Sequence, residues 1–287
     1  MSEINNAQRA QVLVEALPYI QKYYGKVIVV KYGGNAMINE ELKHDVMRDM
    51  VLMHLIGVKV VLVHGGGPEI SSMLKRVGKE SKFVDVLRVT DEETSEIVQM
   101  ILAGKINKSL VAKLDNLGVR AMGICGMDGG LIKAEMIDER LGYVGEIKKI
   151  DPQPILDLLE KGYIPVVSTI GCDETGHVYN INADTAAAAI AASLHAESLI
   201  SMTDTVGLLR DPSDPSTLIR RIDLKGVEQL KEEGIISGGM IPKVDCCTKA
   251  VREGVRKVFI IDGRVPHALL LETLTDEGAG TMFKKEI

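Results

Sequence analysis

The sequence predicts an α/β fold in which an open, mainly parallel β-sheet is sandwiched by helices. Two observations lead to this prediction. Continuous β-branched runs bounded by Gly, Asn or Pro are typical of parallel strands buried on both faces, and such runs occupy residues 26–31, 58–64, 164–170, 198–202 and 257–261. Segments with helical spacing of apolar residues separate most of these runs, so strands and helices alternate along the chain.

The segments between the strands have patterns of their own. Residues 41–56 and 91–116 carry apolar side chains three to four positions apart, which predicts amphipathic helices. Residues 183–195 are rich in alanine, so a helix there can pack closely against the sheet. Short alternating segments at 131–136 and 143–150, in a Gly-rich region, predict hairpins on the rim of the fold.

The sequence contains one candidate boundary between domains, near His195, where a predicted helix ends and a new strand begins. We therefore predict two lobes, residues 26–195 and 196–287, preceded by a helical segment over residues 1–25. Within that segment residues 7–24 are amphipathic, with a proline kink, and the apolar side is formed by Val12, Leu13, Ala16, Leu17 and Ile20. This apolar side needs a partner, either in its own lobe or in another subunit.

Composition limits the classes of function. The 287 residues include 34 Lys and Arg against 40 Asp and Glu, a net charge of −6, so no basic face for a nucleic-acid backbone is expected. The apolar runs are too short for a membrane span and the N-terminus lacks the pattern of a signal peptide, which favours a cytoplasmic protein. The cysteines form no C-x-x-C pair and predict neither a zinc site nor a disulfide framework; they are Cys125, Cys172, Cys246 and Cys247.

Glycine-rich loops follow two of the predicted strands. Lys31-Tyr32-Gly33-Gly34 ends the first strand, and His64-Gly65-Gly66-Gly67-Pro68 ends the second. Ligands of open α/β sheets bind beyond the carboxyl ends of strands, where glycines let backbone N–H groups approach an anion. The loops match neither established nucleotide-binding glycine pattern. They are therefore either a phosphate cradle or tight turns only.

Two lysines lie in settings where a charge is costly unless an anion is near. Lys31 ends an apolar strand. Lys243 stands in the predicted first turn of a helix, beside Pro242 and after Gly238 and Gly239. The alternative is that both are surface charges.

The segment Tyr179-Asn180-Ile181-Asn182-Ala183-Asp184-Thr185 precedes the alanine-rich helix. Asn182 or Asp184 is suited to cap that helix. The functional alternative is that Asn180 holds a polar group of a substrate while Asp184 orients catalytic lysines. The segment beginning Thr203-Asp204 resembles a loop at the edge of a nucleotide site.

In this order the five segments K-x-G-G-N, H-G-G-G-P, N-x-N-A-D, T-D-x-x-G and G-G-M-x-x-K resemble the amino-acid kinase superfamily, most closely the N-acetylglutamate kinases. The resemblance runs from about residue 26 to residue 283. Arg88-Val89-Thr90-Asp91 narrows it, because the carbamate, aspartate and uridylate kinases of this fold are not similar there.

The resemblance implies a kinase that uses ATP with Mg²⁺ to phosphorylate the γ-carboxylate of N-acetyl-L-glutamate, the second step of arginine biosynthesis. The first lobe would hold the amino acid and the second the nucleotide, with no metal bound by the protein itself. Implied catalytic residues are Lys31, Lys243 and Asp184. Implied substrate-binding residues are Gly66, Gly67, Arg88 and Asn180. Implied nucleotide-binding residues are Gly33, Gly34, Thr203, Asp204, Gly238 and Gly239.

The N-terminal extension accompanies hexameric, arginine-inhibited members of that family, built as trimers of dimers. The C-terminal tail looks like their arginine-binding segment, with His267, Glu277 and Gly280 as implied residues. We expect Glu277 and backbone carbonyls to hold the guanidinium and α-amino groups of L-arginine, and N–H groups near Gly280 to hold its carboxylate.

Two other functions compete. A kinase of the same fold for another acid, such as glutamate 5-kinase or carbamate kinase, is disfavoured by Arg88 and by the motif around Asn180. A catalytically silent amino-acid sensor is disfavoured because it has no need to retain Lys31, Asp184 and Lys243 together.

Overall fold

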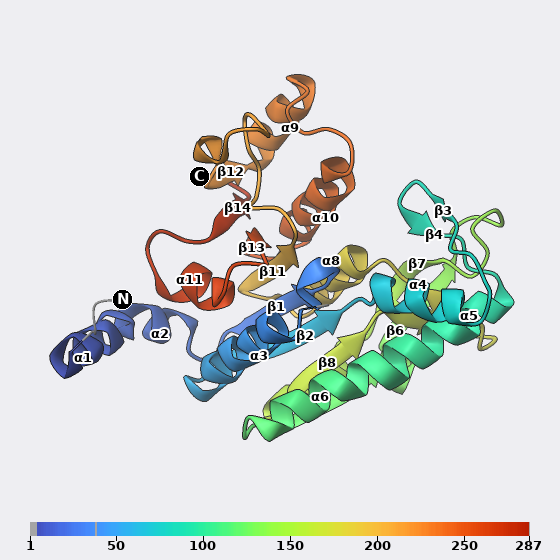
Figure 1. Cartoon of the computed structure of the whole chain (residues 1–287), viewed down its shortest axis with the longest axis horizontal. Helices are drawn as coiled ribbons and strands as arrows, with labels where there is room; N and C mark the ends of the chain where they lie inside the picture. Colours follow the sequence, from blue (N-terminus) through green and yellow to red (C-terminus); the bar gives the residue numbers. More distant parts are fainter. Residues whose placement is uncertain (1–4, 38, 287) are drawn as a thin grey trace.

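A computed structural model describes residues 5–37 and 39–286. Its centre is an eight-stranded sheet with the order β12-β14-β13-β11-β1-β2-β8-β5, crossed by helices on both faces (Figure 1). The pairs from β13 through β5 are all parallel, while β14 runs antiparallel to β13. The predicted fold class is confirmed.

The predicted strands form the middle of this sheet: β1 (Val27–Tyr32), β2 (Lys59–His64), β8 (Ile164–Ser168), β11 (Ser198–Thr203) and β13 (Lys257–Asp262). The run predicted at 164–170 is divided, because its last residue begins a separate strand, β9 (Ile170–Cys172), in another sheet. The strands that were not predicted lie at the two edges of the sheet: β5 (Ala121–Cys125), β12 (Arg221–Asp223) and β14 (Gly280–Lys284).

Two helical layers cover the sheet. One layer contains α3 (Glu40–Leu55), α4 (Gly67–Arg76), α5 (Glu92–Gln99), α6 (Asn107–Asn116) and α11 (Ala268–Leu274). The other contains α7 (Gln153–Glu160), α8 (Ala183–Ser193), α9 (Leu224–Glu232) and α10 (Met240–Arg252). Alternate residues of each strand serve the two layers, as in β2, where Val60 and Leu62 face the first core and Val61 and Val63 face the second.

The helix predicted over residues 91–116 contains a widened turn. It begins as α5, passes through the π-helical segment η2 (Met100–Ile106) and continues as α6. Apolar residues keep a spacing of three to four positions through this segment, so the sequence does not mark it. The alanine-rich α8 packs against β1 and α10, and its residues Ala186 and Ala187 are fully buried.

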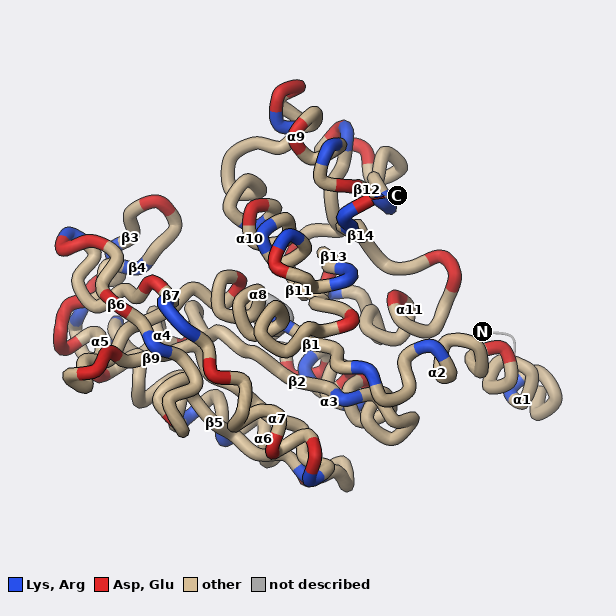
Figure 2. Tube along the Cα trace, turned by 180° about the vertical axis from the view of Figure 1, so that it is seen from behind, with Lys and Arg blue, Asp and Glu red and all other residues tan. Residues whose placement is uncertain are grey.

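A second sheet of four strands forms the rim, in the order β10-β9-β6-β7. The strands β6 (Ile132–Met136) and β7 (Gly145–Ile150) pair antiparallel, which confirms the pairing expected of these segments. Figure 2 shows β7 beside α8, a contact that joins the rim to the central layers. The remaining short elements are β3 (Phe83–Val84), β4 (Leu87–Arg88), β10 (Val178–Asn180), η1 (Gly34–Met37), η3 (Asp128–Gly130) and η4 (Pro215–Thr217).

The N-terminal segment forms two helices, α1 (Asn6–Glu15) and α2 (Leu17–Tyr23), and Pro18 lies in the first turn of α2. Helix α2 packs against α11 and buries Tyr23. Helix α1 buries none of its residues and extends away from the body of the chain (Figure 1). Among the described residues, therefore, α2 packs against the body of the chain, whereas α1 contacts α2 and buries none of its side chains. Residues 1–4 of the predicted segment lie outside the described residues.

Strands β11 to β14 belong to the same sheet as β1 and β2. The predicted lobes thus share one continuous sheet, and a division near residue 195 stays a prediction. Among the residues that the structure describes, no helix is long and apolar enough to cross a membrane.

Candidate active site

A cavity of about 240 Å³ lies beyond the carboxyl ends of β1 and β2. The two glycine loops meet there because β1 and β2 are parallel neighbours, with Tyr32 opposite His64. The cavity also reaches the loop after β10. The sequence-predicted residues that line it are Lys31, Gly33, Gly34, Gly66, Gly67, Arg88 and Asn180.

Close packing explains two of the glycines. A Cβ atom at position 66 would lie 2.2 Å from Cδ1 of Ile106. At Gly34 the backbone has φ +73°, a conformation that favours glycine, and a Cβ atom would lie 2.9 Å from Oδ1 of Asp204. The loop after β1 is therefore in direct reach of the loop after β11.

Lys31 and Asp184 form the central ion pair of the site. The Lys31 Nζ lies 3.0 Å from Asp184 Oδ1, with the two side chains only 10% and 19% exposed. The Ser201 hydroxyl donates to the same carboxylate oxygen at 3.1 Å. Burial opposes ionisation of Asp184, but Lys31, Ser201 and Lys243 outweigh it and hold the pKa of the carboxyl below its usual value. Asp184 is thus a carboxylate at neutral pH.

Lys243 reaches the same region from the other layer. It lies in the first turn of α10, after Gly238 and Gly239, as the sequence predicted. Its Nζ donates to Thr203 Oγ1 at 2.7 Å, which places the lysine against the carboxyl end of β11. Lys31 and Lys243 therefore approach Asp184 from two different elements of the fold.

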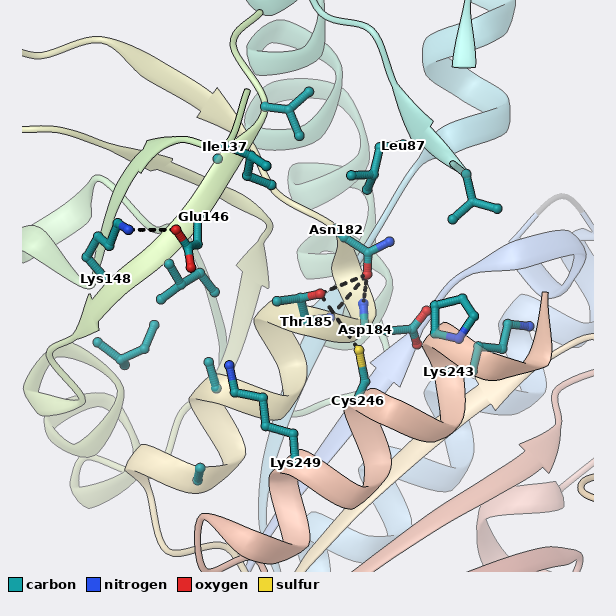
Figure 3. Close-up of a pocket in the computed structure, with 18 of the residues that line it drawn as sticks. Leu87, Ile137, Glu146, Lys148, Asn182, Asp184, Thr185, Lys243, Cys246 and Lys249 are labelled. Atoms are coloured by element: carbon teal, nitrogen blue, oxygen red, sulfur yellow. Dashed lines mark hydrogen bonds and ion pairs between the residues drawn. The ribbon is translucent and has the colours of Figure 1, made fainter. Parts of the chain in front are cut away.

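A larger groove of about 640 Å³ opens beside these residues, between α8, α10 and β7. Figure 3 shows Asn182, Asp184 and Thr185 at the start of α8, facing the helix that carries Lys243 and Cys246. The Asn182 side chain accepts hydrogen bonds from the backbone of Asp184 and Thr185, so Asn182 is the helix cap. Because Asn182 lines both spaces, the groove and the glycine cavity adjoin.

Arg88 is held at the cavity wall by three hydrogen bonds. Its guanidinium donates to Ser81 Oγ at 2.6 Å, to Ser71 Oγ at 2.8 Å and to the Gly67 carbonyl at 2.9 Å. The guanidinium carbon also lies 4.7 Å from the centre of the Phe83 ring. Only 6% of Arg88 is exposed, so this cation is fixed rather than free to move in solvent.

Asn180 stands next to Arg88 through Thr90. The Asn180 amide donates to Thr90 Oγ1 at 3.4 Å, and the Thr90 hydroxyl donates to the Arg88 carbonyl at 2.8 Å. The structure therefore joins the segments around residues 88–91 and 179–185, which are far apart in the sequence.

The predicted allosteric residues do not all meet. Glu277 and Gly280 line a separate cavity of about 500 Å³ between α2 and the segment after α11. His267 is not among its lining residues. Instead its Nδ1 lies 2.6 Å from Asp49 Oδ1, on α3. The Ala279 N–H, next to Gly280, donates to Glu272 at 2.6 Å, so backbone donors there already serve a carboxylate of this chain.

Sequence reasoning missed the residues that orient the predicted ones: Ser71, Ser81 and Ser201. Serines carry no distinctive pattern, and Ser201 becomes visible only from strand register, because it stands opposite Lys31. Within residues 5–37 and 39–286, no group of three His, Cys, Asp or Glu side chains is arranged to hold a metal ion.

Comparison with known proteins shows the family of this chain. A family model described as the amino acid kinase family matches residues 26–262. The acetylglutamate kinase of Brachyspira hyodysenteriae is 56% identical over 288 residues, covering 100% of both chains. That of Clostridium beijerinckii is 53% identical, covering 98% of this chain and 99% of the relative.

Solved structures share the fold. An N-acetylglutamate synthase from Neisseria gonorrhoeae, complexed with coenzyme A and N-acetyl-glutamate, superposes with a TM-score of 0.85 at 26% identity, covering 97% of this chain. This chain spans 64% of that structure. Carbamate kinase from Giardia lamblia, bound to AMP-PNP, gives a TM-score of 0.65 at 17% identity, covering 91% of this chain and 99% of the other.

An open α/β sheet with two lysines and glycine loops at its carboxyl edge, together with this match, defines a phosphotransferase of the amino acid kinase family, to which the chain belongs. Its full-length relatives place it among the acetylglutamate kinases, enzymes of arginine biosynthesis.

Proposed function

We propose that this chain transfers the γ-phosphoryl group of ATP to the γ-carboxylate of N-acetyl-L-glutamate, giving N-acetylglutamyl 5-phosphate and ADP. The observation that carries the proposal is the glycine-walled cavity with Lys31 and Arg88 in its lining. The acceptor has two carboxylates, and the cavity offers two fixed cations. Arg88 suits the α-carboxylate because its three hydrogen bonds leave an N–H on Nη1 and the N–H on Nε for a ligand, while Gly66, Gly67 and Lys31 suit the γ-carboxylate.

The proposed chemistry needs no general base. A carboxylate is already ionised at neutral pH, so the barrier to reaction is repulsion between the acceptor and the phosphates of ATP. Lys31, Lys243 and the glycine N–H groups would stabilise the charge of the transferred group in the transition state. Asp184 would hold the lysines in place rather than accept a proton, a role supported by its lowered pKa and its 3.0 Å contact with Lys31.

ATP with Mg²⁺ enters this proposal as the second substrate. Its phosphates would lie along the glycine pair that follows β1 and the glycine pair that precedes α10, next to the loop after β11. The proposed nucleotide-binding residues are Gly33, Gly34, Thr203, Asp204, Gly238 and Gly239. The 2.7 Å hydrogen bond of Lys243 to Thr203 and the close approach of Gly34 to Asp204 support this grouping.

We further propose feedback inhibition by L-arginine in a hexamer built from three dimers, in a cytoplasmic enzyme. The exposed apolar side of α1 and the 500 Å³ cavity beside α2 support the regulatory part. Glu277 remains the proposed guanidinium partner. Because Glu272 already takes a backbone N–H beside Gly280, the inhibitor carboxylate suits the cations of this cavity better: Lys22, Arg220, Arg221, Lys257 and Lys284.

Trapping of the acyl phosphate with hydroxylamine tests the proposal. We expect ATP-dependent hydroxamate formation with N-acetyl-L-glutamate that exceeds the rates with glutamate, aspartate and carbamate. A preference for one of the other acids would replace the substrate assignment. Absence of turnover with all four, together with measurable binding of N-acetyl-L-glutamate, would favour the silent sensor.

A further inference from the structure

His64 occupies the position directly before the glycine loop and is fully buried. It is the last residue of β2. Val60 and Leu62 of that strand face the layer formed by α3, α5 and α6, so the alternation of the strand directs the His64 ring into the same layer. There it meets Asn107, the first residue of α6, which is also fully buried.

The hydrogen bonds around Asn107 determine which ring nitrogen of His64 carries the proton. The Asn107 Nδ2 lies 2.8 Å from the Val166 carbonyl and 3.3 Å from the Ile124 carbonyl, which can only accept, and 3.2 Å from His64 Nε2. Lys108 Nζ donates to Asn107 Oδ1 at 3.1 Å, which agrees with this orientation of the amide. An amide nitrogen donates and does not accept, so His64 Nε2 is an acceptor and the proton is on Nδ1.

The protonated nitrogen of His64 faces the glycine loop. Nδ1 lies 2.9 Å from the Gly65 carbonyl oxygen and donates to it. Burial lowers the pKa of the ring to about 4, so His64 is neutral at neutral pH and retains one acceptor and one donor nitrogen.

The peptide that joins Gly65 to Gly66 is therefore fixed. Because a trans peptide is planar, its N–H points away from its C=O. With the Gly65 carbonyl turned toward the His64 ring, the Gly66 N–H points to the opposite side, where Gly66 lines the cavity. Helix α4 begins at the next residue, so this N–H belongs to the positive end of a helix.

The π-helical segment η2 packs against the same glycine loop. Leu102 and Ile106, both within η2, lie so close to Gly66 that a Cβ atom there would come within 2.8 Å and 2.2 Å of their side chains. Asn107 follows η2 directly. One widened turn thus places both the apolar wall against Gly66 and the amide against His64.

We propose that His64 and Asn107 are positioning residues, which hold the Gly66 N–H toward the phosphoryl group as it is transferred. This inference rests on the proposed function. His64 acts as a neutral imidazole protonated on Nδ1, and it contacts neither substrate. If the Gly65–Gly66 peptide turned over, one N–H group would be lost from the backbone donors that line the cavity. Lys31 and Lys243 would be unaffected.

Imidazole ¹⁵N NMR of the whole enzyme tests the proposed protonation state of His64 without a mutation. We expect His64 to show the neutral form protonated on Nδ1, unchanged between about pH 6 and pH 8. The form protonated on Nε2, or a ring that becomes charged in this range, would overturn the proposal.

Two matched substitutions of His64 test its proposed role in positioning the Gly66 N–H. The amide nitrogen of Asn falls close to the position of Nδ1 in His, and that of Gln close to the position of Nε2. We expect His64→Asn to keep most of kcat, because it can still donate to the Gly65 carbonyl. We expect His64→Gln to lose about tenfold or more in kcat, with KM for ATP unchanged.

A merely structural role would make activity follow thermal stability, so the melting temperatures of both variants are measured in parallel. Equal kcat values for His64→Asn and His64→Gln would contradict the positioning role. If one variant fails to fold, the NMR result still decides the hydrogen-bond pattern. Failure of the proposed function is recognised separately, because the wild-type enzyme would then form no hydroxamate from N-acetyl-L-glutamate.

Discussion

Replacing each active-site lysine by methionine separates catalysis from stability. Lys31 and Lys243 are both proposed to stabilise the transferred phosphoryl group, so either replacement removes one charge from the transition state. Loss of such a stabiliser reduces kcat by about a hundredfold, or about 3 kcal/mol. KM for N-acetyl-L-glutamate should change much less than kcat, because the charge matters most while the phosphoryl group is in flight.

The effects on folding should differ between the two variants. Lys31→Met leaves the carboxylate of Asp184, which is only 19% exposed, without the ammonium group that lies 3.0 Å from it. Breaking a buried pair in this way lowers the free energy of unfolding by about 3–5 kcal/mol. Lys243→Met removes a hydrogen bond to Thr203 and a weaker charge interaction with Asp184 but no direct ion pair, so a smaller loss, about 1 kcal/mol, is expected.

The assays are initial-rate hydroxamate formation and urea unfolding, with Lys249→Met as the matched control. Lys249 lies on the same helix as Lys243 and lines the same groove, but its side chain is 65% exposed. The control should keep both kcat and stability. Near-normal kcat in Lys31→Met or Lys243→Met would refute the role of that lysine, and equal destabilisation of the two would refute the importance of the ion pair.

Three further predictions concern other parts of the chain. Arg88→Lys should raise KM for N-acetyl-L-glutamate about tenfold or more with ATP affinity unchanged. The three donors of an ammonium cannot both replace the hydrogen bonds of Arg88 to Ser71, Ser81 and the Gly67 carbonyl and bind a carboxylate. An altered ATP affinity would place Arg88 elsewhere. Burial raises the pKa of Asp49 to about 6, so the ionised carboxylate opposes folding above that pH. In urea titrations, Asp49→Asn should therefore stabilise the protein by up to about 3 kcal/mol more at pH 8 than at pH 4. A pH-independent effect would contradict this prediction. Deletion of residues 1–24 should give active dimers that L-arginine no longer inhibits normally, and a hexamer with unchanged inhibition, in sedimentation and rate assays, would contradict the role of the N-terminal helices.

The central strands could be predicted because they are buried on both faces. Val60–Val63 is one apolar run, and β2 contains all of it. The edge strand β5 escaped prediction because its sequence, Ala-Met-Gly-Ile-Cys, contains one β-branched residue and a glycine. Strand β14 also escaped, since it pairs antiparallel at the far end of the sheet, beyond the run of alternating strands and helices.

The site could be predicted as a set of residues but not as a geometry. Local patterns identified Lys31, Asp184 and Lys243, and a 3.0 Å contact joins the first two. The hydrogen bonds that orient them depend on strand register and helix packing, which no local pattern contains. Thus Ser201 was missed although it faces Lys31 across β1 and β11. His267 was expected near Glu277 from the resemblance alone, yet it lies against Asp49 of α3.

Oxygen labelling tests the proposed reaction most directly. The carboxylate oxygen that attacks the γ-phosphorus becomes the bridging oxygen of the acyl phosphate. Hydroxylamine then attacks the carbonyl carbon, the C–O bond breaks, and phosphate leaves with that oxygen. With N-acetyl-L-glutamate carrying ¹⁸O at both oxygens of its γ-carboxylate, ³¹P NMR should therefore detect one ¹⁸O in each phosphate released. Phosphate without the label, formed at the rate of ATP consumption, would show that the γ-carboxylate is not the acceptor.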